Sequence, residues 1–126
     1  MVQLDYKSSK PIYEQIVEQV KLNVMKQYLK SGDAIPSVRK LALELSITPG
    51  TVAKAYQELE RQQIIETIRG KGTFIAGEIE LKPDEKKVLE IKKCLQTELM
   101  ELKMMGYDLK KVLKMVEEIY EEMSVC

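Results

Sequence analysis

The sequence predicts a mostly helical α+β fold: three short helices, then a β-hairpin, then two further helices. Apolar residues recur every three or four positions over most of the chain, which is the spacing of amphipathic helices. Residues 64–76 differ, because β-branched residues lie there on both sides of a glycine-rich turn. The 126 residues, 44% of them hydrophobic, suffice for one compact domain or a small domain with an appendage.

The first predicted helix spans residues 11–29. Its apolar residues follow at intervals of four from Ile12 to Tyr28, with others widening the stripe. Pro11 suits the first turn, where its missing N–H group has no partner to lose. Gly32 can adopt the left-handed conformation that ends many helices, so we expect the helix to stop shortly before it.

Two shorter helices follow, joined by a tight connection at Ser46-Ile47. We expect Ser37 to cap the first, residues 38–45, and Thr48 to cap the second, which begins at Pro49 and ends near Gln63. Two helices joined by such a turn form a helix-turn-helix. The residues expected to be buried are Val38, Leu41, Ala42, Leu45, Val52, Ala55, Tyr56 and Leu59.

The hairpin is predicted from strands at residues 64–68 and 73–76, joined by the basic turn Arg69-Gly70-Lys71-Gly72. Three helices followed by such a hairpin constitute a winged helix-turn-helix, in which the hairpin is the wing. This predicted first domain occupies residues 1–77.

The composition changes after Gly77, and residues 78–126 are predicted to form a two-helix tail behind a short linker, 78–83. One helix extends from residue 84 to about 105, Gly106 breaks it, and Asp108 caps the last helix. Because so few residues cannot bury two apolar stripes internally, we expect a second copy to cover them in a two-fold symmetric dimer. The expected interface residues are Val88, Ile91, Leu95, Leu99, Leu102, Leu109, Val112, Leu113, Val116 and Tyr120.

The composition argues against several classes of function. The chain has no histidine, which excludes a histidine base and histidine metal ligands, and no paired acid–base motif favours an enzyme. We expect no metal and no cofactor, and two free thiols at Cys94 and Cys126. No apolar segment is long enough for a membrane span or a signal peptide, so we expect a cytoplasmic protein.

The net charge of zero conceals a division between the two predicted parts. Residues 1–77 contain 11 basic and 8 acidic side chains, whereas residues 78–126 contain 9 and 12. The first part is therefore basic by three charges and the second acidic by three. Neutrality of the whole chain is not an argument against a nucleic-acid partner.

Candidate DNA-binding residues lie at the starts of the two short helices. The N-terminus of a helix can enter the major groove, where Thr48, Pro49, Gly50 and Thr51 would form its first turn. Lys54 would neutralise a phosphate, although Thr-Pro-Gly is equally typical of an ordinary helix start. Before them lie Ser37, whose helix N-terminus can receive a phosphate, and Arg39, which can pair with guanine or phosphate or simply be a solvated surface residue.

The predicted wing tip is the more specific signal. Arg69 and Lys71 alternate with Gly70 and Gly72 and are followed by Thr73, so bulk is absent where a backbone must approach a partner closely. Arginine in a narrow minor groove recognises DNA shape. The alternative is a flexible turn with solubilising charges. The spacing does not match a phosphate-binding loop, and no helix follows.

The sequence resembles the winged-helix domain of the GntR family of bacterial transcription regulators over residues 10–76. The resemblance rests on PIYEQI, then GDAIPSVRKLALELSITPGTVAKAYQELERQQII, then RGKGTFIA, in this order and spacing. The short two-helix tail is similar to that of the YtrA subfamily. The resemblance implies a homodimeric repressor of a palindromic operator, often in an operon with an ABC transporter. It also implies DNA contacts by Arg39, by Pro49 to Thr51 and by Gly70.

The chain departs from the family at the start of the third helix. Many relatives have arginine or asparagine where this chain has Pro49 and Gly50, and some have arginine in place of Ala53. More of the specificity is then expected from Arg39, the wing and the shape of the DNA. The competing interpretation is an interaction module, in which the winged helix docks onto a protein and does not select a DNA sequence.

Overall fold

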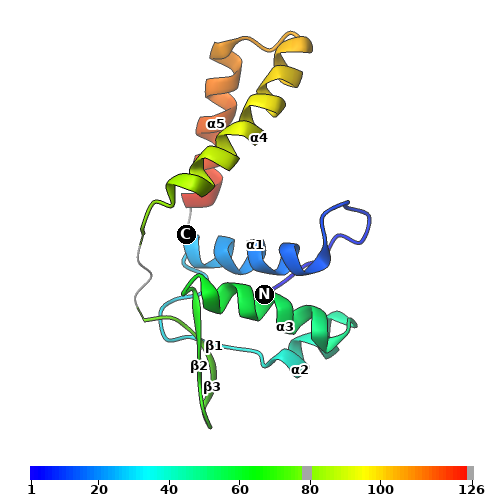
Figure 1. Ribbon diagram of the computed structural model, residues 1–126, viewed down its shortest axis with the longest axis vertical. Coiled ribbons are helices and arrows are strands. Elements are labelled where there is room, and N and C mark those ends of the chain that lie inside the picture. Colours follow the sequence, from blue (N-terminus) through cyan, green and yellow to red (C-terminus); the bar gives the residue numbers. More distant parts are fainter. Residues whose placement is uncertain (78–80, 125–126) are drawn as a thin grey trace. The chain divides into compact units, whose positions relative to one another are not determined.

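The computed structural model describes residues 1–77 and 81–124, which form two compact units on either side of the gap (Figure 1). Its mostly helical α+β architecture confirms the predicted fold class. In chain order the elements are α1 (Ile12–Met25), β1 (Ala34–Ile35), α2 (Val38–Leu45), α3 (Pro49–Arg61), β2 (Ile65–Ile68), β3 (Gly72–Ile75), α4 (Glu85–Met104) and α5 (Leu109–Ser124).

The core of the first unit lies where α1, α2, α3 and the sheet meet. Ile16 and Val20 of α1, Val52 and Leu59 of α3 and Ile75 of β3 are completely buried. Of the residues predicted to be buried in α2 and α3, six are buried, and Val38 and Leu45 are half-buried against the same core. The apolar spacing of these two helices therefore predicted their inward faces correctly.

The sheet has a third strand that the sequence pattern did not predict. Strand order is β1-β3-β2, all antiparallel, and Ala34 and Ile35 of β1 lie opposite Phe74 and Thr73 of β3. A strand of two residues is too short to show an alternating pattern, so only the β2–β3 hairpin was visible in the sequence. The N–H group of Gly32 also donates to the carbonyl of Ile75 at 2.9 Å, which extends this pairing.

The end of α1 was predicted wrongly. The helix stops at Met25 and not near Leu29, because Gln27 adopts a left-handed conformation with φ of 60° and turns the chain towards β1. Tyr28, expected on the apolar stripe, is therefore 62% exposed. Pro11 occupies the N-cap position and not the first turn. Gly32 does have a positive φ, but it lies in the turn that leads into β1.

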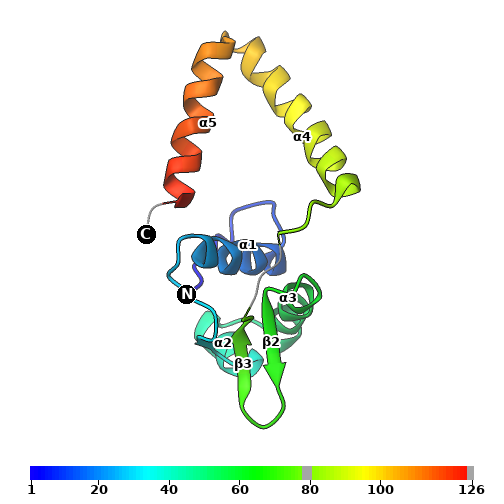
Figure 2. The same ribbon diagram turned by 90° about the vertical axis from the view of Figure 1, so that its left-hand side faces the viewer.

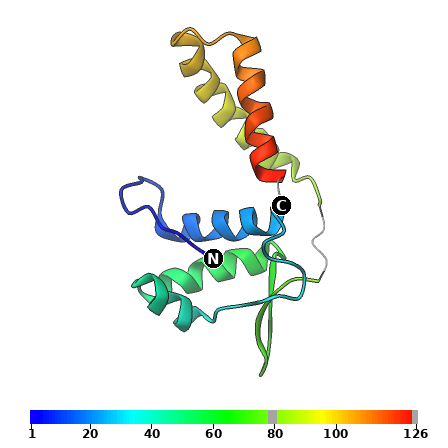
Figure 3. The same cartoon turned by 180° about the vertical axis from the view of Figure 1, so that it is seen from behind.

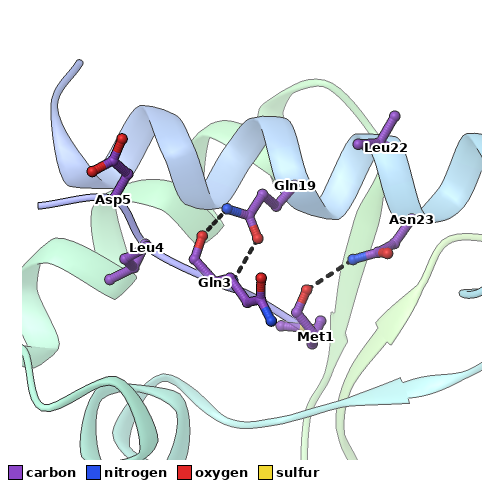
Figure 4. A pocket seen from close by; sticks show the side chains of 7 residues that line it. All are labelled: Met1, Gln3, Leu4, Asp5, Gln19, Leu22 and Asn23. Atoms are coloured by element: carbon purple, nitrogen blue, oxygen red, sulfur yellow. Dashed lines mark hydrogen bonds between the residues drawn. The ribbon is translucent and has the colours of Figure 1, made fainter. Parts of the chain in front are cut away.

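An N-terminal arm, residues 1–10, lies along α1 and is attached by amide side chains spaced four residues apart. Gln15 accepts from the N–H group of Asp5 and donates to its carbonyl. Gln19 bonds to Gln3 in the same way, and Asn23 donates to the carbonyl of Met1 at 2.9 Å (Figure 4). Two residues of extended chain rise about 6.6 Å and four helical residues about 6 Å, so the two periods match.

We expect the innermost of these amides to stabilise the first unit most. Gln15 is only 7% exposed, and its amide also donates to the carbonyl of Lys10. Gln15→Ala leaves half-buried backbone groups unpaired and should lower the free energy of unfolding by about 1–3 kcal/mol. Gln19→Ala is the matched control, and its loss should stay below about 0.5 kcal/mol because water can replace its bonds. Urea unfolding followed by circular dichroism measures both, and equal losses would contradict this account.

The second unit consists of α4 and α5, and an aspartate caps the start of each; the cap at Asp108 was predicted. Asp84 accepts from the N–H group of Lys87 and Asp108 from that of Lys111, at 3.2 and 2.9 Å. Gly106, with φ of 92°, lies in the turn between the helices. Figure 2 shows the two helices diverging from this turn, and neither helix has a buried residue. The apolar stripes of both helices are thus uncovered in a single chain.

Part of the predicted linker, residues 78–80, and Cys126 lie outside the described residues. Cys94 is a free, exposed thiol on α4. Within the described ranges, no helix has the length and apolar character needed to cross a membrane. No three acidic or cysteine side chains gather there in a way that would bind a metal ion.

Candidate nucleic-acid interface

Three segments of the first unit contain the predicted DNA-binding residues: the start of α2, the start of α3 and the turn between β2 and β3. Figures 1 and 3 show α1 covering one side of α3, while α2 and the tip of the β2–β3 hairpin lie on the side turned away from α1. We call this second side the groove side. Two of the three segments, on α2 and the hairpin, lie entirely on it.

The start of α2 combines an N-cap with exposed cations. The hydroxyl of Ser37 accepts from the N–H group of Lys40 at 3.1 Å, as a capping serine does. Arg39 and Lys40 are both exposed in this first turn, which contains no acidic residue. Positive charges oppose the dipole at a helix N-terminus, so an anion bound there would relieve an unfavourable interaction. Lys40 was not among the predicted DNA-binding residues, although it lies beside Arg39 in the sequence.

A hydrogen bond from α3 fixes the position of this turn. The hydroxyl of Tyr56, otherwise buried in the core, donates to the carbonyl of Pro36 at 2.6 Å, directly before Ser37. Burial raises the pKa of Tyr56 to about 12, and the nearby carboxylate of Glu44 adds to the shift. The hydroxyl therefore keeps its proton at any physiological pH and remains a donor. Its effect is to hold the start of α2 against α3.

The start of α3 differs in detail from the prediction. Thr48 is the N-cap residue, but its hydroxyl bonds to no backbone N–H group and lies instead 3.0 Å from the hydroxyl of Thr51. Gly50 is exposed and helical, and a Cβ atom added there would meet nothing within 4 Å. No packing within the described residues therefore requires glycine at this position. A partner that approaches the backbone closely would require it.

Lys54 lies apart from the groove side. Its ammonium group is 4.0 Å from the centre of the Tyr13 ring on α1, a cation–π contact. Glu58 of α3 also faces α1, since it interacts electrostatically with Lys21 of that helix. The prediction placed Lys54 on one face with Arg39 and the wing. In the structure its ammonium group lies instead against α1, on the side of α3 away from the groove side.

The β2–β3 turn has the geometry that its glycines predicted. Gly70 and Gly72 have φ of 82° and 122°, conformations that other residues adopt only with strain. The N–H group of Lys71 donates to the carbonyl of Ile68 at 2.9 Å and closes the turn. Arg69 and Lys71 are exposed, and within the described chain neither forms an ion pair. Thr73 is half-buried in β3, so its side chain is less available than those at the tip.

Comparison with known proteins agrees with this geometry. Residues 12–75 match the family described as bacterial regulatory proteins, gntR family. The chain belongs to the GntR family.

This GntR-family chain is similar over almost its whole length to proteins of about the same length. It is 44% identical to the HTH-type transcriptional repressor YtrA of Bacillus subtilis strain 168, over 94% of this chain and 92% of YtrA. A crystal structure of a transcriptional antiterminator from Listeria monocytogenes EGD-e has a TM-score of 0.87 and 38% identity, and the match covers 100% of this chain and 94% of that one.

The DNA-binding domain of AraR, crystallised in complex with operator ORX1, shares the fold of the first unit. Its TM-score is 0.53 at 24% identity, and the match covers 60% of this chain and 95% of that one. The family match and the similarity to YtrA establish that the GntR-family chain is a DNA-binding transcriptional regulator. The family consists of regulatory proteins, in agreement with a sequence that contains no acid–base motif.

In this GntR-family chain, the Tyr56 hydroxyl should contribute measurably to stability. Tyr56→Phe keeps the ring in the core but leaves the carbonyl of Pro36 without its donor, which should cost about 1 kcal/mol of unfolding free energy. Tyr13→Phe is the control, because among the described residues the Tyr13 hydroxyl bonds only to the adjacent Glu14 carboxylate, at 3.4 Å. Urea unfolding of both variants compares them, and an effect of the same size in each would show that the Pro36 bond is not special.

Proposed function

We propose that this regulator is a homodimeric repressor. It binds a palindromic operator in its own operon, which also encodes an ABC transporter, and it blocks polymerase by occupying the site. Each protomer places α3 in a major groove, and the two grooves lie about 34 Å apart along the DNA. It acts in the cytoplasm, where this DNA lies.

The observation that supports this proposal best is the set of unpaired cations on the groove side. Arg39, Arg69 and Lys71 have no ion-pair partner within the described residues, whereas Arg61 on α3 bonds to Glu58 and Lys10 of the arm to Glu18. Exposed ion pairs contribute little to stability, so unpaired cations cost the fold little. Phosphates of a DNA duplex are the partners that this arrangement suits.

The predicted residues divide into three groups by their expected contacts. The start of α2 supplies Arg39 for a guanine or a phosphate, and Ser37 orders the helix terminus that faces a phosphate. The turn between β2 and β3 enters the minor groove with Arg69, while its glycines permit close approach. The start of α3 offers small or hydroxyl-bearing side chains to the major groove. The residues assigned to the wing and α3 are Thr48, Pro49, Gly50, Thr51, Lys54, Arg69, Gly70, Lys71, Gly72 and Thr73.

Binding to the DNA upstream of its own gene should depend steeply on salt. Arg39→Ala and Arg69→Ala should each weaken binding by more than about 1 kcal/mol, because each removes a contact to a base or phosphate. Lys10→Ala is the control for loss of one positive charge, since its ammonium group already bonds to Glu18. Fluorescence anisotropy across a salt series measures all four proteins. Affinity independent of salt, or arginine variants equal to the control, would refute the proposed contacts.

The tail supports the homodimer in this proposal. Val88, Ile91, Leu95 and Leu113 are about half exposed and Leu109 is 73% exposed, so α4 and α5 bury too little by themselves for stable helices. Soluble monomers rarely expose apolar surface over two whole helices. A second copy, with its own stripes uncovered in the same way, would cover both through a two-fold axis. The remaining residues assigned to this interface are Leu99, Leu102, Val112, Val116 and Tyr120.

A charge on the stripe should separate the protomers. Leu99→Asp should give a monomer at concentrations where the parent sediments as a dimer, because a carboxylate cannot be buried unpaired in the interface. Its operator affinity should also fall at least about tenfold, since the two DNA-binding units are then no longer linked. Leu81→Asp, at a residue 94% exposed ahead of α4, is the matched control. A monomeric parent, or a Leu99→Asp dimer, would refute the interface.

A further inference from the structure

The outer face of α3 has small residues in its first two turns, followed by a single exposed amide. Gly50, Ala53 and Gln57 follow one another at intervals of three and four residues, and the last is exposed. At about 100° per residue, Gly50 lies about 20° and Ala53 about 40° from Gln57 around the helix. Recognition helices of homeodomains contact the major groove through positions with this spacing. We call these three residues the α3 strip.

The packing of α3 shows which way the α3 strip faces. Lys54 contacts Tyr13 of α1, and Tyr56 bonds to Pro36 ahead of α2, so these two residues mark opposite sides of the helix. Gln57 lies between them, about 60° from Lys54 and about 100° from Tyr56, on the surface opposite the buried residues. The α3 strip is therefore directed outward and, relative to Lys54, turned away from α1 towards the groove side.

The amide of Gln57 is also uncommitted within the protein. The structure gives it no hydrogen bond to any of the described residues. Three other glutamines of this unit are committed to the fold: Gln15 and Gln19 attach the N-terminal arm, and Gln62 donates to Glu58 at 2.7 Å. Gln57 lies about 12 Å along the axis from Pro49, a distance close to the width of a major groove.

We propose that Gln57 determines specificity by pairing with an adenine in each operator half-site. Its carbonyl oxygen accepts from the adenine N6 amino group, and its amide NH₂ donates to N7, a pairing that adenine presents only in the major groove. Gly50 and Ala53 leave room for the backbone of α3 to approach the base edges. This proposal rests on the operator binding proposed above. It adds base recognition by the third turn of α3 to the contacts proposed for the first turn, where no side chain can form the bidentate pairing with adenine.

The test compares operators that differ by one base pair. The operator is first defined by footprinting the DNA upstream of this gene, and each base pair of the half-site is then replaced symmetrically. Anisotropy titrations of the full chain should find one A·T pair whose replacement weakens parent binding about 5- to 100-fold. For Gln57→Ala, replacement of the same pair should matter less than twofold, while the preferences elsewhere and the salt dependence stay unchanged.

Lys54→Ala is the matched control on the neighbouring side of α3. It should weaken binding to every operator by the same factor and leave the base preferences intact. A Gln57→Ala variant that keeps all the parent's preferences, or that loses affinity uniformly, overturns the proposal. Loss of preference at a G·C pair overturns the assignment to adenine. A parent that binds all sequences alike would contradict the proposed operator binding itself, which separates the two failures.

Discussion

The burial of one face of α3 determines the geometry of the whole first unit. Val52, Ala55 and Leu59 are completely buried, and Tyr56 nearly so, against α1, α2 and the sheet. Burying a large aliphatic side chain contributes about 1.5–3 kcal/mol, so rotating α3 about its axis would be costly. A helix that cannot rotate on its core also cannot rotate its outer face. The orientation of the recognition surface is thus a consequence of core packing.

The same packing of α3 separates paired charges, which lie next to α1, from unpaired cations, which lie on the groove side. On the side of α3 next to α1, charged groups are satisfied by the protein: hydrogen bonds from Arg61 and Gln62 lower the pKa of Glu58 to about 2. Lys54 lies over the Tyr13 ring on that side. On the groove side, Arg39 and the wing cations have no such partners among the described residues. The chain neutralises its charges where they support the fold and leaves them available where DNA would supply the partner.

Sequence reasoning succeeded where a local rule determined the outcome. Ser37 caps α2 because serine suits that position, and the wing turns at Gly70 and Gly72 because only glycine adopts those angles easily. It failed where distant contacts decided. Strand β1 exists because β3 offers an edge to pair with, and α1 ends early because Gln27 turns the chain towards that edge. No pattern of residues nearby in the sequence contains that information.

The candidate DNA-binding residues follow the same rule: those positioned by local sequence were predictable, and those positioned by distant contacts were not. Arg39 and the wing residues stand on short elements whose local sequence fixes their exposure. The placement of Lys54 beside Tyr13, and of Gln57 beside Gly50 and Ala53, depends on how α3 packs between its neighbours. From the sequence we selected Lys54 for its charge and did not select Gln57. The structure distinguishes them, because Lys54 contacts Tyr13 of α1, whereas Gln57 has no hydrogen bond to the described residues.

Because the first unit has only a weak positive charge, its affinity for DNA would depend on the tail that links two copies. An excess of three basic residues over acidic ones in residues 1–77 allows only a few phosphate contacts for each copy. Two weak DNA-binding units joined through one interface can exceed the affinity of either by about 10²–10⁴-fold without any new contact. The apolar stripes of α4 and α5 would then serve DNA binding as directly as the cations do. A chain with zero net charge can bind a polyanion on these terms, because the excess of acidic residues lies in the part that we propose links two copies.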